Sequence, residues 1–329
     1  MPIKLDLSKE QTEGVAFYDA HYRVVFDSSL NAGRQLKLAD PEREAGRVCR
    51  FCGLGKPQVS FDTMAHAVPE FLGNKTLISL NECDACNQLL AKNCEDDLAK
   101  WCGPMRTVSQ IRGKSGVPTY KNRDMRIEMG KKGLEIGIVA EDLESHLKFD
   151  GPFTFTPPVA ASTQPFVPIN AAKALIKIAC SLCPPKLLGE CKPAIDWLMG
   201  RAGAKMSMFP VLFAFTPGPM PYGDGRVLLL QRKNDHRFPL IWCILATANY
   251  RFQFFVPFCL SDAWMMKEKS VQLTFPHFPD VFGDAWPHGK TRFGTFDWSG
   301  TEPIVREQSF SFHVESVKKS GIPPTAEQK

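Results

Sequence analysis

The sequence contains no hydrophobic run long enough to cross a membrane. A transmembrane helix needs about 18 or more consecutive apolar residues, and the most apolar stretch, residues 240–248, is closely followed by the charged Arg251. Residues 1–14 mix acidic and basic side chains and lack the apolar core of a secretory signal peptide. We therefore expect no membrane contact and a cytoplasmic location.

The chain also lacks internal repeats and low-complexity tracts. Its composition, 44% hydrophobic and 23% charged residues, is that of a folded globular protein. This composition excludes disorder as the dominant state. The length of 329 residues favours two domains, since a domain usually takes about 100–200 residues.

The positive charge of the chain is concentrated in one segment. The formal net charge is +5, and residues 106–132 carry eight basic against two acidic side chains, a local net charge of +6. Such a segment suits contact with the phosphate backbone of a nucleic acid. Because it also contains Gly113, Gly116 and Pro118, a solvated linker explains it equally well.

The second half of the chain alternates between helical and strand-like patterns. Residues 17–26 fit either a strand or a short helix. A helix is expected from Ala171 to about Leu182, with Asn170 as its N-cap, and a second helix at residues 192–200. Strands are expected at residues 134–139, 153–156, 211–215, 226–231, 240–246 and 251–258.

Four of the eleven cysteines form two CxxC pairs. In a reducing compartment, an odd number of cysteines favours metal ligands or buried thiols over disulfides. Each CxxC pair is expected to form one tight metal-binding turn, or knuckle. Thirty residues separate Cys52 from Cys83, so an insert must lie between the two knuckles. Paired thiolates predict a tetrahedral structural zinc site, formed by Cys49, Cys52, Cys83 and Cys86. A third pair, Cys180 and Cys183, has no second pair beside it and is interpreted as core packing.

The insert between the knuckles carries a recognisable order of polar residues. His66 is followed by Pro69, the pair Gly73-Asn74 and Asn81, and Asn87 comes directly after the second knuckle. With these residues in order, about sixty residues of the chain resemble the zinc-containing HNH endonuclease superfamily. The pattern AHxxPExLGN…ECDxCN, with Asn93-Cys94-Glu95-Asp96 further along, looks like a bacterial subfamily found in phage-defence settings.

The resemblance implies a role for each of these residues. His66 would be the general base, since a neutral imidazole is available near pH 7. Asn87 would be an oxygen ligand of a catalytic Mg²⁺ or Mn²⁺ ion. Asn81 would be the central Asn that braces the loop carrying the base, and Asn74 would share that task or form a turn with Gly73.

One position departs from the family pattern. Many members carry Asp or His directly before the base as a second metal ligand, and Ala65 stands there in this chain. Either another carboxylate or water supplies that ligand, or the enzyme is weakened or inactive. The candidate carboxylates are Asp62, Glu70 and Glu95, and Glu95 lies two helical turns beyond Asn87.

These observations together predict an α+β protein with an N-terminal zinc-stapled ββα-metal module and a C-terminal mixed α+β domain. The expected divisions are residues 1–44 as an N-terminal extension, 45–103 as the HNH module, 104–132 as a basic connector, and 133–329 as a regulatory or recognition domain.

The function expected from this organisation is metal-dependent hydrolysis of DNA, in bacterial defence against foreign DNA. Double-strand cleavage would need a homodimer or two successive nicks, because one module has one active site, and the C-terminal domain would recognise DNA, a small-molecule signal or a defence partner protein. The chain has no GxxxxGK loop ending in Ser or Thr, but nucleotide sensors need no fixed motif. The alternative is a catalytically dead zinc-ribbon protein that binds nucleic acid.

Overall fold

The computed structural model describes most of the chain in ranges that are separated by short gaps. The described residues are 9–40, 46–113, 116–122, 125–138, 147–148, 154–155, 161–202, 209–234, 237–268, 271–280, 282, 286–308 and 312–313. Four residues of the basic segment, Lys114, Ser115, Arg123 and Asp124, lie outside them, as do part of the strand expected at 153–156 and the end of the strand expected at 134–139.

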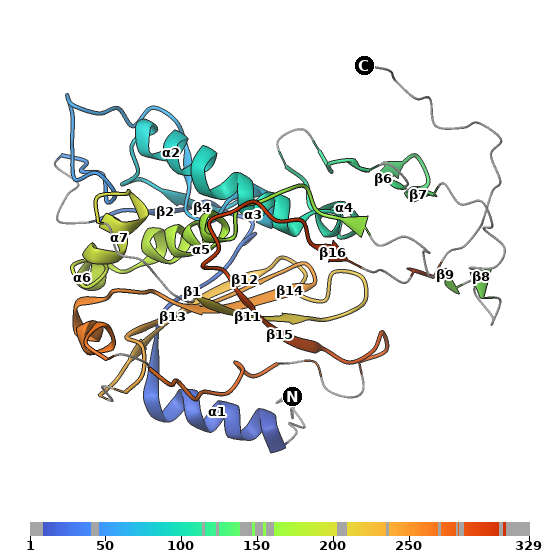
Figure 1. Ribbon diagram of the computed structural model, residues 1–329. Coiled ribbons are helices and arrows are strands. Elements are labelled where there is room, and N and C mark those ends of the chain that lie inside the picture. The colour runs from blue at the N-terminus through green and yellow to red at the C-terminus, as the bar shows by residue number, and fades with distance from the viewer. Residues whose placement is uncertain are drawn as a thin grey trace.

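A six-stranded antiparallel sheet forms the centre of the molecule (Figure 1). Its strands are rich in Val, Ile, Leu and Phe, which favour the extended backbone. The two middle strands, β13 and β14, are buried along almost their whole length, so they alternate little between apolar and polar residues. The strand order is β1 (Tyr22–Ser29), β12 (Arg226–Arg232), β13 (Ile241–Thr247), β14 (Tyr250–Phe255), β11 (Pro210–Phe215) and β15 (Arg292–Asp297).

The edge strand β1 comes from the expected N-terminal extension. Residues 17–26, whose pattern fitted either a helix or a strand, are divided between the two: helix α1 (Lys9–His21) ends where β1 begins. Tyr22 pairs with Arg232 in the sheet, and its hydroxyl accepts a hydrogen bond from Trp242 Nε1 at 2.9 Å. The N-terminal residues therefore belong to the sheet of the C-terminal half.

Helices cover both faces of this sheet (Figure 1). Helix α1 lies on one face, where the Tyr18 hydroxyl donates to the Pro276 carbonyl at 2.7 Å. Helix α5 (Pro168–Leu182) lies on the other face and is buried along most of its length. It begins earlier than expected, with Pro168 in its first turn; the predicted N-cap is wrong, because the Asn170 side chain instead donates to Asp97 at 2.8 Å.

The cysteine-rich segment folds on the same side as α5, in the order strand, strand, helix. Strand β3 (Ala65–His66) pairs antiparallel with β4 (Leu77–Ser79), which pairs in parallel with β2 (Leu36–Leu38). The following helical stretch comprises α2 (Asp84–Leu90), the π-helical η3 (Ala91–Glu95) and α3 (Asp96–Cys102). The short 3₁₀ turn η2 (Glu70–Leu72) lies between the two strands of the β3–β4 pair.

Trp101 of α3 joins this segment to the central sheet. Its side chain is fully buried, and its ring centroid lies 5.2 Å from those of Tyr250, Phe252 and Trp298. Aromatic rings at this spacing contribute packing energy beyond their buried area. The helical end of the segment therefore shares one hydrophobic core with the sheet.

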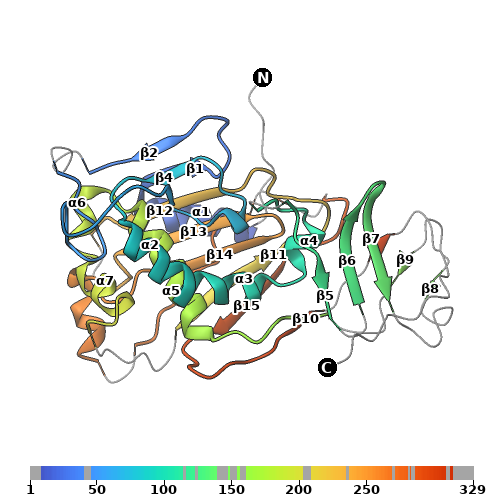
Figure 2. The same ribbon diagram turned by 90° about the horizontal axis from the view of Figure 1, so that it is seen from above.

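The remaining elements surround this core (Figure 2). Strands β6 (Met125–Gly130) and β7 (Gly133–Ile138) form a hairpin. The hairpin spans the domain division that was expected between residues 132 and 133. The fold class predicted from the sequence, α+β, is confirmed. Among the described residues, no helix combines the length and the apolar character that a membrane span needs. The other elements are α4 (Met105–Val108), β5 (Tyr120–Lys121), β6 (Met125–Gly130), β7 (Gly133–Ile138), β8 (Leu147–Lys148), β9 (Thr154–Phe155), β10 (Ala161–Ser162), α6 (Pro185–Leu188), α7 (Lys192–Leu198), η5 (Leu260–Met266), β16 (Glu307–Gln308) and β17 (Phe312–His313).

Candidate metal centre and active site

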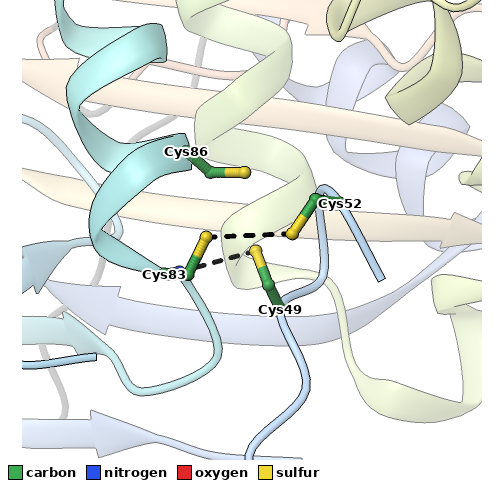
Figure 3. A group of neighbouring side chains, drawn as sticks. All are labelled: Cys49, Cys52, Cys83 and Cys86. Atoms are coloured by element: carbon green, nitrogen blue, oxygen red, sulfur yellow. Dashed lines mark hydrogen bonds between the residues drawn. The ribbon is translucent and has the colours of Figure 1, made fainter. Parts of the chain in front are cut away.

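The two CxxC pairs meet in one cluster of four thiols (Figure 3). Their sulfur atoms all lie within 4.8 Å of one another, and Cys52 Sγ is 3.8 Å from Cys83 Sγ. Cys49, Cys83 and Cys86 are buried, and Cys52 is partly exposed. Four sulfur donors at this separation match a tetrahedral zinc site without an open position.

Local backbone geometry brings the two pairs together. The first knuckle closes where the Cys49 amide donates to the Leu54 carbonyl and the Gly53 amide donates to the Cys49 carbonyl. Gly53 has a φ of 77°, a left-handed conformation that glycine adopts without strain. The second knuckle opens helix α2, and its Cys83 amide donates to Cys49 Sγ at 3.4 Å.

The electrostatics of the cluster favour a cation at its centre. A contact with the Cys86 thiol and several backbone amides lower the pKa of Cys49 to about 5, against the opposing effect of burial. Burial and the neighbouring Cys49 raise the pKa of Cys83 to about 11, and the contact with Cys49 raises that of Cys86. One thiolate thus forms readily while further thiolates repel it, and a bound Zn²⁺ ion would remove that repulsion. The donor set fits zinc.

His66 lies at the end of strand β3, where it pairs with Ile78. Its side chain is 19% exposed, and the next residue, Ala67, continues the ladder by donating to the Leu77 carbonyl at 3.0 Å. The backbone carbonyl of His66 accepts a hydrogen bond from Lys177 Nζ at 2.9 Å. The imidazole is therefore held on a paired strand with access to solvent.

The residue directly before His66 is packed in the core. Ala65 is 1% exposed, and alternation along the strand directs its side chain to the opposite face from His66. Among the carboxylates proposed as substitutes, Glu70 lies beside His66: Glu70 Oε1 is 4.0 Å from His66 Nε2 and 3.5 Å from Lys75 Nζ. Glu70 is the first residue of the turn η2, four positions after His66.

The other two candidate carboxylates have different surroundings. Glu95 Oε1 lies 3.1 Å from Lys177 Nζ, in an ion pair. The backbone amide of Asp62 donates to Asp84, whose carboxylate also holds Ser60 and Thr63. These bonds fix the loop that leads into β3.

The loop after His66 is braced by Asn74. Its amide nitrogen donates to the Val68 carbonyl at 2.6 Å and the Leu77 carbonyl at 3.0 Å, and its oxygen accepts from the amides of Thr76 and Leu77. The residue is fully buried. The motif predicts that Asn74 either shares the bracing of this loop with Asn81 or forms a turn with Gly73, and these hydrogen bonds favour the bracing role.

Asn81 supports a different part of the module. Its side-chain oxygen accepts from the Asp40 amide at 2.9 Å, and its amide nitrogen donates to the Val48 carbonyl at 3.2 Å. These bonds fix the chain directly before the first knuckle. The motif predicts that Asn81 braces the loop after His66, whereas these two side-chain hydrogen bonds go to Asp40 and Val48.

Asn87 lies in the first half of helix α2, one residue beyond the last thiol. It is partly exposed, and its backbone amide continues the helix by donating to the Cys83 carbonyl at 2.9 Å. Its side-chain oxygen is a hard donor of the kind that Mg²⁺ and Mn²⁺ take. His66 and Asn87 thus occupy the end of the first strand and the start of the helix in one ββα unit.

The sequence does not predict the contacts of two buried charged residues, Arg50 and Lys177. Arg50, inside the first knuckle, pairs with Asp40, and its Nη1 donates to the carbonyls of Cys180, Ser181 and Cys183 at 3.1, 2.9 and 2.8 Å. Lys177 contacts the nuclease segment from α5. Neither residue belongs to a motif, so only the three-dimensional fold identifies their partners.

The third CxxC pair is part of the hydrophobic core. Cys180 and Cys183 are buried, and Cys183 Sγ lies 3.6 Å from Cys191 Sγ. Burial and the thiol contact raise the pKa of Cys183. The Cys183 thiol is therefore kept neutral, as expected for a packing residue.

Comparison with known families agrees with this geometry. Residues 49–101 match the family model described as HNH endonuclease. No curated protein and no solved structure gives a significant match. This segment is thus an HNH endonuclease module with a four-cysteine cluster, within an α+β protein.

Proposed function

We propose that this protein is a metal-dependent endonuclease that hydrolyses DNA phosphodiester bonds with His66 as the general base. The observation that carries the proposal is the placement of His66. It is partly exposed on a strand that Asn74 and Lys177 hold in place, inside a segment that matches HNH endonucleases.

The residues of the site divide the chemical work. His66 would take the proton from the attacking water. The Glu70 carboxylate, 4.0 Å from Nε2, would then stabilise the resulting imidazolium. Asn87 would hold the catalytic Mg²⁺ or Mn²⁺ ion, which when bound neutralises charge on the scissile phosphate.

A plasmid assay tests this proposal. The full-length protein is incubated with supercoiled plasmid and Mg²⁺ or Mn²⁺, beside His66→Ala and the exposed remote control His288→Ala. We expect nicking by the wild type and by His288→Ala, and none by His66→Ala. Equal zinc content in all three proteins shows that the fold is retained. Nicking that persists unchanged in His66→Ala would refute the assignment of the base.

The buried methyl group of Ala65 favours one alternative. Without a carboxylate at that position, the module would bind nucleic acid and cleave nothing. Binding of plasmid fragments without nicking, under every metal condition and unaffected by His66→Ala, would support this second function.

The surrounding structure suggests further features of the proposed enzyme. The C-terminal α+β part would target or gate the nuclease, because α5 and the sheet pack directly against it. Double-strand cleavage would require a homodimer or sequential nicks. A cytoplasmic role in bacterial defence, alone or with a partner protein, is proposed from resemblance. Cleavage that begins only when a cyclic nucleotide is added would identify the signal.

A further inference from the structure

A single buried lysine connects helix α5 to the nuclease segment. The side chain of Lys177 is 1% exposed, and its Nζ atom contacts three groups of that segment. It donates to the His66 carbonyl at 2.9 Å, lies 3.2 Å from Glu82 Oε2, and lies 3.1 Å from Glu95 Oε1. No other ammonium group among the described residues is both this buried and in contact with the module.

The charge of this lysine is matched inside the protein. An ammonium group in a low-dielectric interior is costly unless carboxylates and hydrogen-bond acceptors surround it. Burial lowers the pKa of Lys177, but Glu82 and Glu95 outweigh this effect and raise the pKa above its usual value. The two carboxylates thus favour the protonated form of Lys177.

The three partners lie at three different places along the ββα unit. His66 ends strand β3, Glu82 directly precedes the second knuckle, and Glu95 ends the helical turn η3. All three contact Lys177 Nζ, which comes from a helix and lies 111 positions beyond His66 in the sequence. The direction of the His66 carbonyl, and with it the path of the strand that carries the imidazole, is thus set from outside the module.

We propose that Lys177 is a positioning residue of the active site, which fixes the His66 backbone relative to the helix that carries Asn87. This inference rests on the proposed function of His66 as the base. It predicts that helix α5 is an integral part of the nuclease and that residues 45–103 by themselves form an incomplete site.

The test must distinguish a positioning role of Lys177 in the active site from a purely structural role in stabilising the fold. Lys177→Met removes the bond to His66 but leaves the buried Glu82 and the partly exposed Glu95 carboxylates without this cation. The double variant Lys177→Met/Glu82→Gln removes one positive and one negative charge and keeps the side-chain volumes similar. Lys173→Met is the matched control, because Lys173 lies on the same helix and its Nζ contacts the Trp197 ring instead.

The experiment uses the full-length protein and two independent measurements. Zinc content and thermal melting establish that the variants are folded. Plasmid nicking is then measured at saturating Mn²⁺ as a function of pH and of DNA concentration. In parallel, the Cε1–H resonance of His66 is followed by NMR with ¹³C-labelled histidine, and is assigned with His66→Gln.

If Lys177 positions the base, the folded double variant shifts the His66 resonance and lowers kcat. A displacement of about 1 Å costs roughly 100-fold in rate, and KM for DNA should stay nearly constant because the buried Lys177 cannot contact the DNA. Lys173→Met should leave both measurements at wild-type values. The inference is overturned if the folded double variant keeps the wild-type His66 resonance, or if it cleaves like Lys173→Met when the wild type is active.

The NMR measurement also separates this inference from the proposed function. A wild type that never nicks DNA would refute the nuclease proposal. In that case a His66 resonance that shifts in the double variant but not in Lys173→Met still supports the positioning role. An unmoved resonance refutes it, whatever the cleavage assay shows.

Discussion

Lys177 Nζ lies 2.9 Å from the backbone carbonyl oxygen of His66, although 111 positions separate the two residues. A second buried cation, Arg50, connects the same two parts in the opposite direction. It lies in the first knuckle of the module and donates to carbonyls at the end of helix α5. The four-cysteine module and α5 therefore exchange charged contacts in both directions. Such paired contacts restrict how the module can move on the sheet.

Replacing Arg50 tests how much this connection stabilises the fold. Arg50→Met leaves the Asp40 carboxylate buried without its partner and three carbonyls of α5 without a donor. We expect a loss of about 3–5 kcal/mol in the free energy of unfolding. Urea unfolding followed by circular dichroism measures it. The exposed neighbour Arg47 provides the control, and Arg47→Met should change stability by less than about 0.5 kcal/mol.

Removal of zinc should unfold the module locally and abolish cleavage. Cys83 is a ligand of the cluster and also precedes the first residue of helix α2, so its loss disturbs the helix that carries Asn87. We expect Cys83→Ser to bind less than one zinc ion per chain and to show no nicking when Mg²⁺ is supplied. Zinc is quantified by atomic absorption.

The control for this prediction is a buried cysteine outside the cluster. Cys94 is buried in η3 and is not one of the four clustered thiols. Cys94→Ala should retain one zinc ion and wild-type nicking. Full zinc content in Cys83→Ser would show that the four thiols do not form the binding site.

The two asparagines of the motif should respond differently to substitution. Asn74→Ala removes four hydrogen bonds beside His66, and we expect it to cost about 3 kcal/mol and to lower the nicking rate per folded molecule. Asn81→Ala removes two bonds at the first knuckle, so it should cost about 1–2 kcal/mol and leave that rate unchanged. Rates normalised by circular dichroism distinguish the two variants; equal losses of rate would contradict the assignment of the brace to Asn74.

The zinc cluster and most of the sheet strands were predictable because their signals are local. A CxxC pair places two sulfur donors on one turn, and runs such as residues 241–247 are apolar and extended wherever they pack. The same locality explains the errors. Asn170 has the residue type of an N-cap, but a tertiary contact with Asp97 takes its side chain, and no pattern along the chain reports that contact.

The roles of Asn74, Asn81 and Lys177 depend on which distant backbone groups lie beside them. The family motif points to Asn81 as the brace and leaves Asn74 as a second brace or a turn residue, whereas the Val68 carbonyl lies beside Asn74. Lys177 has a helical, apolar neighbourhood in the sequence, where a lysine is usually a solvated residue. The pairing of β1 with β12 is equally hidden, since register depends on partners nearly two hundred residues away.

Glu70 should assist the base through its charge. Its Oε1 atom lies 4.0 Å from His66 Nε2, with about a fifth of each side chain exposed. At this distance a carboxylate stabilises an imidazolium by about 1 kcal/mol in a well-solvated site, which corresponds to a roughly fivefold to tenfold loss of kcat in Glu70→Gln. Single-turnover nicking at saturating Mn²⁺ measures this loss. Glu13→Gln, on helix α1 at the opposite face of the sheet, is the control and should keep the wild-type rate. If nicking instead disappears in Glu70→Gln and increasing the Mn²⁺ concentration restores it, Glu70 acts as the missing metal ligand rather than as a partner of the base.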